Sequence, residues 1–368
     1  MMANAPPRLQ SAIEHVRPVG TAWRDRARAR LDRLTKPPQS LGRLEWIAAR
    51  LCAIQETLTP RAAPRRIVVF AGDHGVTAEG VSAYPSAVTA QMVGNFLRGG
   101  AAINALARAT GADVCVVDVG VAGEIDATGG AASFVSRRVR PGTRNMVHEP
   151  ALSEHELASA LGVGLDIADA AARDGVAVLV CGDMGIGNTT AASAMTAAFL
   201  RASASEVTGR GTGIDQATLD RKTAAVTQAL RIHQPGRRPL DVLRTVGGLE
   251  IAAITGACVG AAAHRLAIVG DGFIATAAAL AAAELCPSFL DYWFAGHLSP
   301  EPGHGLQLRY LRQEPLLQLD MRLGEGTGAA LAMHLLGAAA AVINEMATFD
   351  SAGVAEAAAC PVPEAARS

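Results

Sequence analysis

The sequence predicts an α/β protein built on a mainly parallel β-sheet flanked by helices, with a smaller helical domain formed by N- and C-terminal segments. Between residues 67 and 285, short apolar runs alternate with longer Ala-rich stretches, and glycines bound most of the runs. Short continuous apolar runs are typical of strands buried on both faces. Their alternation with helical stretches predicts right-handed crossovers and therefore a parallel sheet.

The expected elements follow in chain order. Residues 1–60 read as polar-faced helices joined by a turn at Pro37 and Pro38. Four strands are expected at residues 67–70, 114–117, 176–180 and 266–269. Residues 326–348 form a last helical stretch rich in Ala and Leu. We therefore expect three parts: a discontinuous small domain of residues 1–60 and 326–355, a large α/β domain of residues 61–325, and a disordered tail of residues 356–368.

Composition and charge exclude several classes of protein. The chain has 368 residues, is 50% hydrophobic and carries a formal net charge of -1, which gives no electrostatic footprint for nucleic acid or an anionic membrane. Its most apolar region, 249–285, is interrupted by His264, Arg265 and Asp271, whereas a membrane span needs about 20 apolar residues. Six cysteines without a Cys-x-x-Cys pair are typical of reduced thiols in a cytoplasmic protein.

Three of the expected strands end in an acidic, glycine-flanked loop. Asp73, Asp183 and Asp271 each follow the glycine at the end of an apolar run. Ligands of open parallel sheets bind beyond the carboxyl ends of the strands, so these three loops should converge on one edge. The alternative is that each Asp merely caps the helix that follows it.

The loop that begins at Asp183 is rich in glycine and runs into a candidate helix at Asn188 or Thr189. Glycine lets the backbone approach a ligand closely, and a helix N-terminus attracts anions. The loop is neither a Walker A motif nor a dinucleotide-binding fingerprint.

Two further residues stand out. Lys222 is one of only two lysines among the 33 Lys and Arg residues, and a compact ammonium suits a single phosphate; a solvated helix lysine is the alternative. Glu325 lies between two glycines ahead of an apolar helix, as a general base on an open turn or as a carboxylate favoured by the helix dipole. His74, His297 and His304 lack the spacing of a zinc site, so we expect no metal.

The motifs together resemble the nicotinate-nucleotide–dimethylbenzimidazole phosphoribosyltransferase family over about residues 10–355. The resemblance lies in the segments 36–45, 71–76, 88–93, 184–190, 211–213 with Lys222, 271–273, 296–299 and 322–326. It implies a Rossmann-like sheet, a homodimer, no cofactor, and transfer of phosphoribose from nicotinate mononucleotide to dimethylbenzimidazole in cobalamin lower-ligand synthesis.

The resemblance also implies roles for particular residues. The catalytic base falls on Glu325. The phosphate and ribose of the donor fall on Asp183, Gly185, Gly187, Asn188, Lys222, Asp271, Gly272 and Ser299. The benzimidazole falls on Ser82, Tyr84, Pro85, Gln91, Met184 and Leu323. Two positions depart from the family pattern: Asp183 replaces a Glu, which retracts the carboxylate by one methylene, and Gln39 replaces a Gly.

Two other functions compete with this interpretation. A nicotinamide-dependent oxidoreductase would share the parallel sheet, but the first strand lacks Gly-x-Gly-x-x-Gly with an acid about 20 residues later. A non-catalytic nucleotide sensor would keep the binding loops, but the intact turn at Glu325 argues against it. An NADH titration and a product assay discriminate among the three.

Overall fold

The computed structural model describes residues 5–211 and 213–355, which divide into two compact units. The larger unit holds the described residues of 1–19 and 61–335, and the smaller unit those of 20–60 and 336–368. The predicted tail, 356–368, lies outside the described residues.

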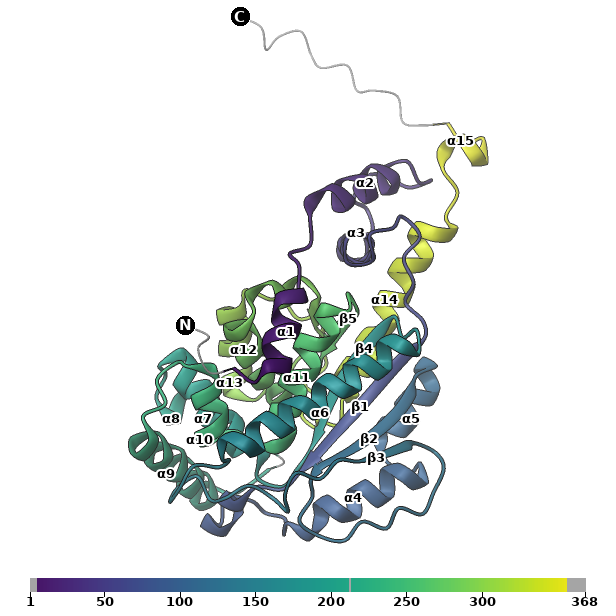
Figure 1. Ribbon diagram of the computed structural model, residues 1–368. Helices are drawn as coiled ribbons and strands as arrows, with labels where there is room; N and C mark the ends of the chain where they lie inside the picture. The colour runs from purple at the N-terminus through teal and green to yellow at the C-terminus, as the bar shows by residue number, and fades with distance from the viewer. Residues whose placement is uncertain (1–4, 212, 356–368) are drawn as a thin grey trace, which may run out of the picture. The chain divides into compact units, whose positions relative to one another are not determined.

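The larger unit is built on a six-stranded sheet in the order β3-β2-β1-β4-β5-β6, with every pair parallel (Figure 1). The parallel sheet is thus confirmed. The strands are β1 (Arg65–Gly72), β2 (Asp113–Gly120), β3 (Ser133–Ser136), β4 (Val178–Met184), β5 (Ala267–Gly270) and β6 (Trp293–Ala295). The four predicted strands are β1, β2, β4 and β5, while the short edge strands β3 and β6 have no predicted counterpart. A separate parallel pair is formed by β7 (His297–Leu298) and β8 (Leu317–Gln318).

Helices cover both faces of this sheet. Right-handed crossovers place α4 (Ala87–Arg98) and α5 (Ala102–Thr110) on one face, and α6 (Glu154–Arg173) and α11 (Leu249–Ala263) on the other (Figure 1). The remaining helices of the unit are α1 (Pro7–His15), η1 (Gly75–Glu79), α7 (Asn188–Leu200), α8 (Ala204–Val207), α9 (Gln216–His233), α10 (Pro239–Val246), α12 (Phe273–Leu285), η2 (Pro287–Asp291), α13 (Pro302–Leu311) and the first half of α14 (Thr327–Glu345).

The boundaries of the two units differ from those of the predicted domains. Residues 1–19 and 326–335, expected in the small domain, belong to the larger unit. Helix α1 buries Leu9 and Ile13 and packs against α6 and α11, so its apolar face ties it to the sheet. The start of α14 follows the turn at Glu325, which is fixed to the sheet edge.

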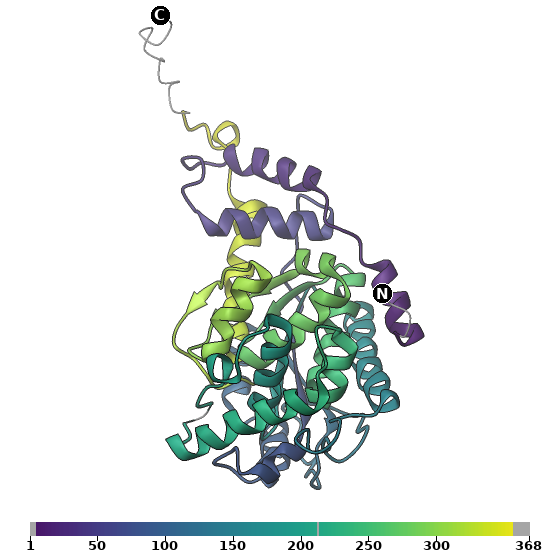
Figure 2. The ribbon, with the colours of Figure 1, turned by 90° about the vertical axis from the view of Figure 1, so that its left-hand side faces the viewer.

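The smaller unit contains α2 (Thr21–Asp32) and α3 (Arg43–Gln55), which pack side by side (Figure 2), the end of α14, and α15 (Phe349–Ala352). The turn expected at Pro37 and Pro38 lies between α2 and α3. A buried ion pair closes it, with Lys36 Nζ 2.8 Å from Glu45 Oε1. The Leu41 N–H donates to the same carboxylate oxygen at 3.0 Å.

Helix α14 is, among the described helices, the one long and apolar enough by length and composition to cross a membrane. Its most apolar window has a mean hydropathy of 1.5 and is 56% buried. A buried core helix passes the same test.

The contact between α6 and α11 depends on glycine. A Cβ on Gly164 would lie 1.9 Å from the Ala253 carbonyl oxygen, and one on Gly256 would lie 2.1 Å from the Leu161 carbonyl oxygen. Backbone atoms cannot retreat as a flexible side chain can, so the two helices approach this closely only because both positions lack a side chain.

We expect Gly164→Ala to lower the melting temperature, because overpacking typically costs about 1–3 kcal/mol. Gly162→Ala, on the same helix, is the matched control: its Cβ would meet only the end of Arg8, at 3.9 Å. Alanine there should stabilise α6 by up to about 1 kcal/mol through helix propensity. Thermal melting followed by circular dichroism compares the two; equal melting temperatures would contradict the proposed close approach.

Candidate active site

Three buried aspartates converge at the carboxyl edge of the sheet, as the sequence predicts. Asp73 follows β1, Asp183 is the penultimate residue of β4, and Asp271 follows β5; none is more than 4% exposed. None of them caps the helix that follows it. Asp73 accepts from the Thr89 hydroxyl at 2.6 Å and the Ala122 N–H at 2.8 Å.

Asp271 fastens the turn that carries Glu325. Its Oδ2 accepts from the Gly326 N–H at 3.2 Å, and its Oδ1 from the Ala329 N–H at 3.0 Å, in the first turn of α14. The Glu325 N–H donates to the Asp183 carbonyl oxygen at 3.2 Å. Gly324, Glu325 and Gly326 have φ angles of 83°, 61° and 89°, so a non-glycine residue is held in the left-handed region, a strained state common at functional sites.

The Glu325 carboxylate is buried, at 4% exposure, against the start of α5. Its Oε2 accepts from the Ile103 N–H at 3.2 Å. Burial raises the pKa of this carboxyl and the charge of Asp271 raises it further, while the bond from Ile103 lowers it. The result is a stronger proton acceptor than an exposed glutamate.

Asp183 lies among three other acids, Asp271, Glu250 and Glu325. Its Oδ1 accepts from the Asn188 side-chain amide at 2.9 Å. Burial raises its pKa well above the ordinary value, and the charges of Asp271, Glu250 and Glu325 add to that rise. The Asp183 side chain, shorter than the Glu of the family pattern, thus contacts Asn188 and the turn around Gly324. A Cβ on Gly324 would lie 3.3 Å from Asp183 Oδ1.

The glycine-rich loop joins β4 to α7, which begins at Asn188 as predicted. A Cβ on Gly185 would lie 2.1 Å from the Gly72 carbonyl oxygen, and Gly187 has a φ of 94°. His74 lies beneath the loop, with Nε2 2.7 Å from Glu250 Oε1 and both side chains buried. Burial opposes protonation of His74, but the charge and hydrogen bond of Glu250 raise its pKa overall.

Lys222, on α9, is buried rather than solvated, with 1% exposure. Its Nζ donates to Thr189 Oγ1 at 2.9 Å and to the Gly209 carbonyl oxygen at 3.1 Å. Burial lowers its pKa to about 8, against the opposing charge of Glu301. A buried ammonium beside a helix N-terminus can bind a single anionic group.

A cavity of about 110 Å³ lies among these loops. Seven predicted site residues line it, and seven further lining side chains were not among the predicted ones. The predicted ones are Asp183, Met184, Gly185, Asn188, Gly272, Ser299 and Leu323; the others are Ile186, Thr189, Phe273, Ile274, His297, Glu301 and Arg322.

Other predicted residues lie behind this lining or away from it. Glu325, Lys222, Asp271 and Gly187 are adjacent to lining residues in the chain or hydrogen-bonded to them. Gln91 lines a different hollow, of about 370 Å³, beside α4. Three more residues, on the segment before α4, are at least partly exposed and do not line the cavity: Ser82, Tyr84 and Pro85.

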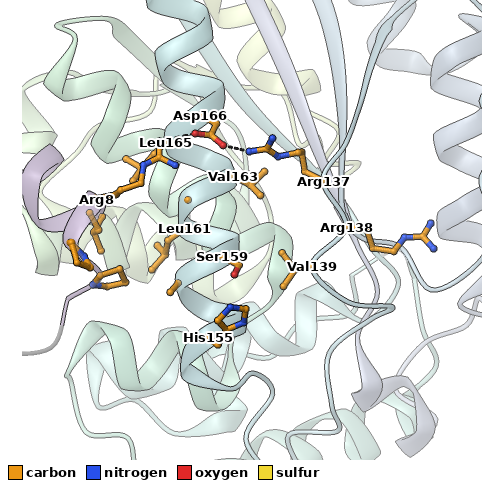
Figure 3. A pocket seen from close by; sticks show the side chains of 15 residues that line it. Arg8, Arg137, Arg138, Val139, His155, Ser159, Leu161, Val163, Leu165 and Asp166 are labelled. Carbon is orange, nitrogen blue, oxygen red and sulfur yellow. Dashed lines mark hydrogen bonds and ion pairs between the residues drawn. The ribbon is translucent and has the colours of Figure 1, made fainter.

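A larger hollow, of about 750 Å³, lies beside α6 and the start of α1 (Figure 3). Arg8 and Arg137 both hydrogen-bond Asp166 there. It contains none of the predicted site residues. Among the described residues, no cluster of three or more His, Cys, Asp or Glu side chains could hold a metal ion.

This parallel sheet, with a buried ammonium beside a helix N-terminus and a buried carboxylate at its carboxyl edge, has the arrangement expected of a nucleotide-binding transferase. A phosphoribosyltransferase family model matches residues 16–354. The chain is 51% identical over 347 residues to the nicotinate-nucleotide–dimethylbenzimidazole phosphoribosyltransferase of Geobacter metallireducens, covering 94% of this chain and 98% of that one. It is 51% identical to the enzyme of the same name from Chloroflexus aggregans, covering 95% and 98%.

The fold agrees with these relatives. The crystal structure of CobT from Thermus thermophilus is 51% identical and superposes with a TM-score of 0.87, covering 91% of this chain and all of that one. The chain belongs to the nicotinate-nucleotide–dimethylbenzimidazole phosphoribosyltransferase family.

The raised pKa of Asp183 predicts how its replacement changes the thermal stability of the protein at different pH values. Because the folded-state pKa of Asp183 is raised, its contribution to stability is present at low pH and is lost as pH rises toward that pKa. We therefore expect Asp183→Asn, which keeps an acceptor for Asn188, to raise the melting temperature at pH 8 and to change it little at pH 4. Asp113→Asn, on the exposed start of β2, is the control. A variant less stable than the parent at pH 8 would contradict the raised pKa.

Proposed function

We propose that the protein transfers the phosphoribosyl group of nicotinate mononucleotide to dimethylbenzimidazole, giving α-ribazole phosphate and nicotinate for cobalamin lower-ligand synthesis. The observation that carries this proposal is the buried Glu325 on its left-handed turn, next in the chain to the cavity-lining Gly324, together with Lys222, which donates a hydrogen bond to the cavity-lining Thr189. The names of the relatives support the same reaction. A cytoplasmic homodimer without a cofactor is part of the proposal.

The reaction needs one general base. Nicotinate leaves from a positively charged pyridinium, so the leaving group requires no proton. The benzimidazole attacks the anomeric carbon of ribose through one ring nitrogen and must lose the proton of the other. Glu325, whose pKa is raised, accepts that proton. Attack opposite the departing nicotinate converts the β-configured donor into an α-riboside.

Binding is divided between two sets of residues. The phosphate and ribose of the donor lie at the amino end of α7 and around Lys222. The residues for this part are Asp183, Gly185, Gly187, Asn188, Lys222, Asp271, Gly272 and Ser299. The flat ring of the acceptor lies on the apolar side chains of Met184 and Leu323, which line the cavity, with Ser82, Tyr84, Pro85 and Gln91 from the segment before and within α4. Alignment of the two substrates supplies much of the rate.

The direct test is incubation of purified protein with nicotinate mononucleotide and dimethylbenzimidazole, followed by chromatography and mass detection. We expect α-ribazole phosphate and nicotinate in equal amounts, with or without a metal chelator. Nucleotide binding without product, for dimethylbenzimidazole, benzimidazole, adenine and phenol alike, would instead favour a sensor. A spectral change on NADH addition would favour an oxidoreductase.

We expect Glu325→Gln to lower kcat by about 10²–10⁴, the usual contribution of a general base, with little change in nicotinate mononucleotide binding. The base must be deprotonated, so activity of the parent enzyme should fall as pH drops through the raised pKa of Glu325, and the variant should lose that acid limb. Asp320→Asn is the matched control, an exposed carboxylate that also has a left-handed φ, of 53°. Equal loss of turnover and donor binding would contradict the base role.

A further inference from the structure

The side chain of Glu301 has an orientation that is unusual for an N-cap residue. Glu301 is the N-cap residue of α13, yet its carboxylate makes no capping hydrogen bond to that helix. The side chain is only 8% exposed and lines the cavity instead. Burying a carboxylate is costly unless it is paired or hydrogen-bonded, so this orientation needs a specific reason.

The carboxylate holds the loop of residues 209–211. Its Oε1 accepts from the Gly211 N–H at 2.9 Å. Its Oε2 packs against Gly209, where a Cβ would lie 2.2 Å away, and has no hydrogen-bond partner among the described residues. Gly211 has a φ of 54°, in the left-handed region that glycine adopts at little cost. The loop can therefore turn tightly beside Glu301.

Lys222 holds the same loop through a different atom. Its Nζ donates to the Gly209 carbonyl oxygen and to Thr189, and a Cβ on Gly211 would lie 3.8 Å from Nζ. An ammonium has three donors, and two of them have acceptors among the described residues. The third is available for a ligand in the cavity that Thr189 and Gly211 line. One short loop thus connects a buried carboxylate to a buried ammonium.

We propose that Glu301 is a positioning residue for the phosphate of the donor nucleotide, acting through the 209–211 loop and through the charge of Lys222. The proposal rests on the proposed function for the identity of the donor. Glu301 does not itself touch the phosphate, because two anions would repel each other. Its carboxylate keeps the lysine protonated and holds the loop in place.

The charges around Lys222 support this role. Burial lowers its pKa to about 8, and Glu301 is the group that raises it. Helix α9 packs against η1, α7, α8 and α10, and none of the titratable residues on these elements contributes to that shift. Those residues are Glu79 on η1, Glu206 on α8, and Asp241 and Arg244 on α10, with none on α7; on α9 itself they are Asp220, Arg221, Arg231 and His233.

The test is the dissociation constant of nicotinate mononucleotide, measured by calorimetry between pH 6 and pH 9. Glu301→Gln keeps an acceptor for the Gly211 N–H but removes the charge, so Lys222 should lose its proton at lower pH. We expect the ratio of the variant and parent constants to be about 1 at pH 6, where Lys222 is protonated in both proteins, and to rise toward pH 9, by about tenfold for each unit by which the pKa of Lys222 falls. The titration of the nucleotide cancels in this ratio.

Asp220→Asn is the matched control, because it neutralises an exposed carboxylate on α9 two residues before Lys222; its ratio should stay near 1. In a Lys222→Ala background, Glu301→Gln should have little further effect, because the group that it acts on is gone.

A ratio that does not change with pH, or a full Glu301 effect without Lys222, would overturn the proposal. Binding is the readout, so a protein that binds the nucleotide but forms no product disproves the proposed function and leaves this inference testable. A parent protein that does not bind the nucleotide disproves the inference.

Discussion

The carboxylate of Asp271 is the contact on which the geometry of the site depends. It accepts two backbone N–H groups at the start of α14 and so fixes the turn that precedes the helix. Its Oδ1 also lies 3.6 Å from His297 Nε2, whose ring packs so closely on Gly328 that a Cβ there would lie 2.1 Å from it. One buried acid thus positions Glu325 relative to strands β4 and β5, which are adjacent in the sheet.

Burial shifts the pKa values of both the acids and the ammonium of the site. It raises the pKa values of Asp183, Asp271 and Glu325, and the charges of neighbouring acids add to the rise at Asp183 and Glu325, which favours proton acceptance. Burial lowers the pKa of Lys222, and the charge of Glu301 limits that effect. Acid and base strengths at pH 7 are therefore set by position in the fold, as is usual in active sites.

The sequence predicts the framework of the fold better than its boundaries. Apolar runs find β1, β2, β4 and β5 because both faces of these strands are buried, whereas β3 is partly exposed and β6 has only three residues. Whether α1 belongs to the larger or the smaller unit depends on which helices its Leu9 face packs against. That packing is a tertiary contact, which the local sequence pattern does not determine.

The site shows the same division. Some site residues carry a local signal in the sequence. Neighbouring glycines draw attention to Asp183 and Glu325, and the rarity of lysine draws attention to Lys222. His297 and Glu301 also line the cavity, but the importance of Glu301 comes from Gly211 and Lys222, about 90 and 79 residues away in the chain. The sequence signal nearest to Glu301 is the Gly296–Ser299 motif, which ends two residues before it, and that motif does not indicate a role for a carboxylate.

The size of the cavity bears on how two substrates are accommodated. At about 110 Å³, the cavity is smaller than the roughly 300–1,000 Å³ of most ligand sites. It therefore has room for the phosphoribosyl group but not for the two aromatic rings in addition. Leu323 lines it and is 52% exposed, an apolar surface that a bound ring would cover. In the proposed reaction, covering it would stabilise the complex by about 25 cal/mol per Å² and would remove water from the vicinity of Glu325. Ring binding and activation of the proposed base would then be coupled through the same turn.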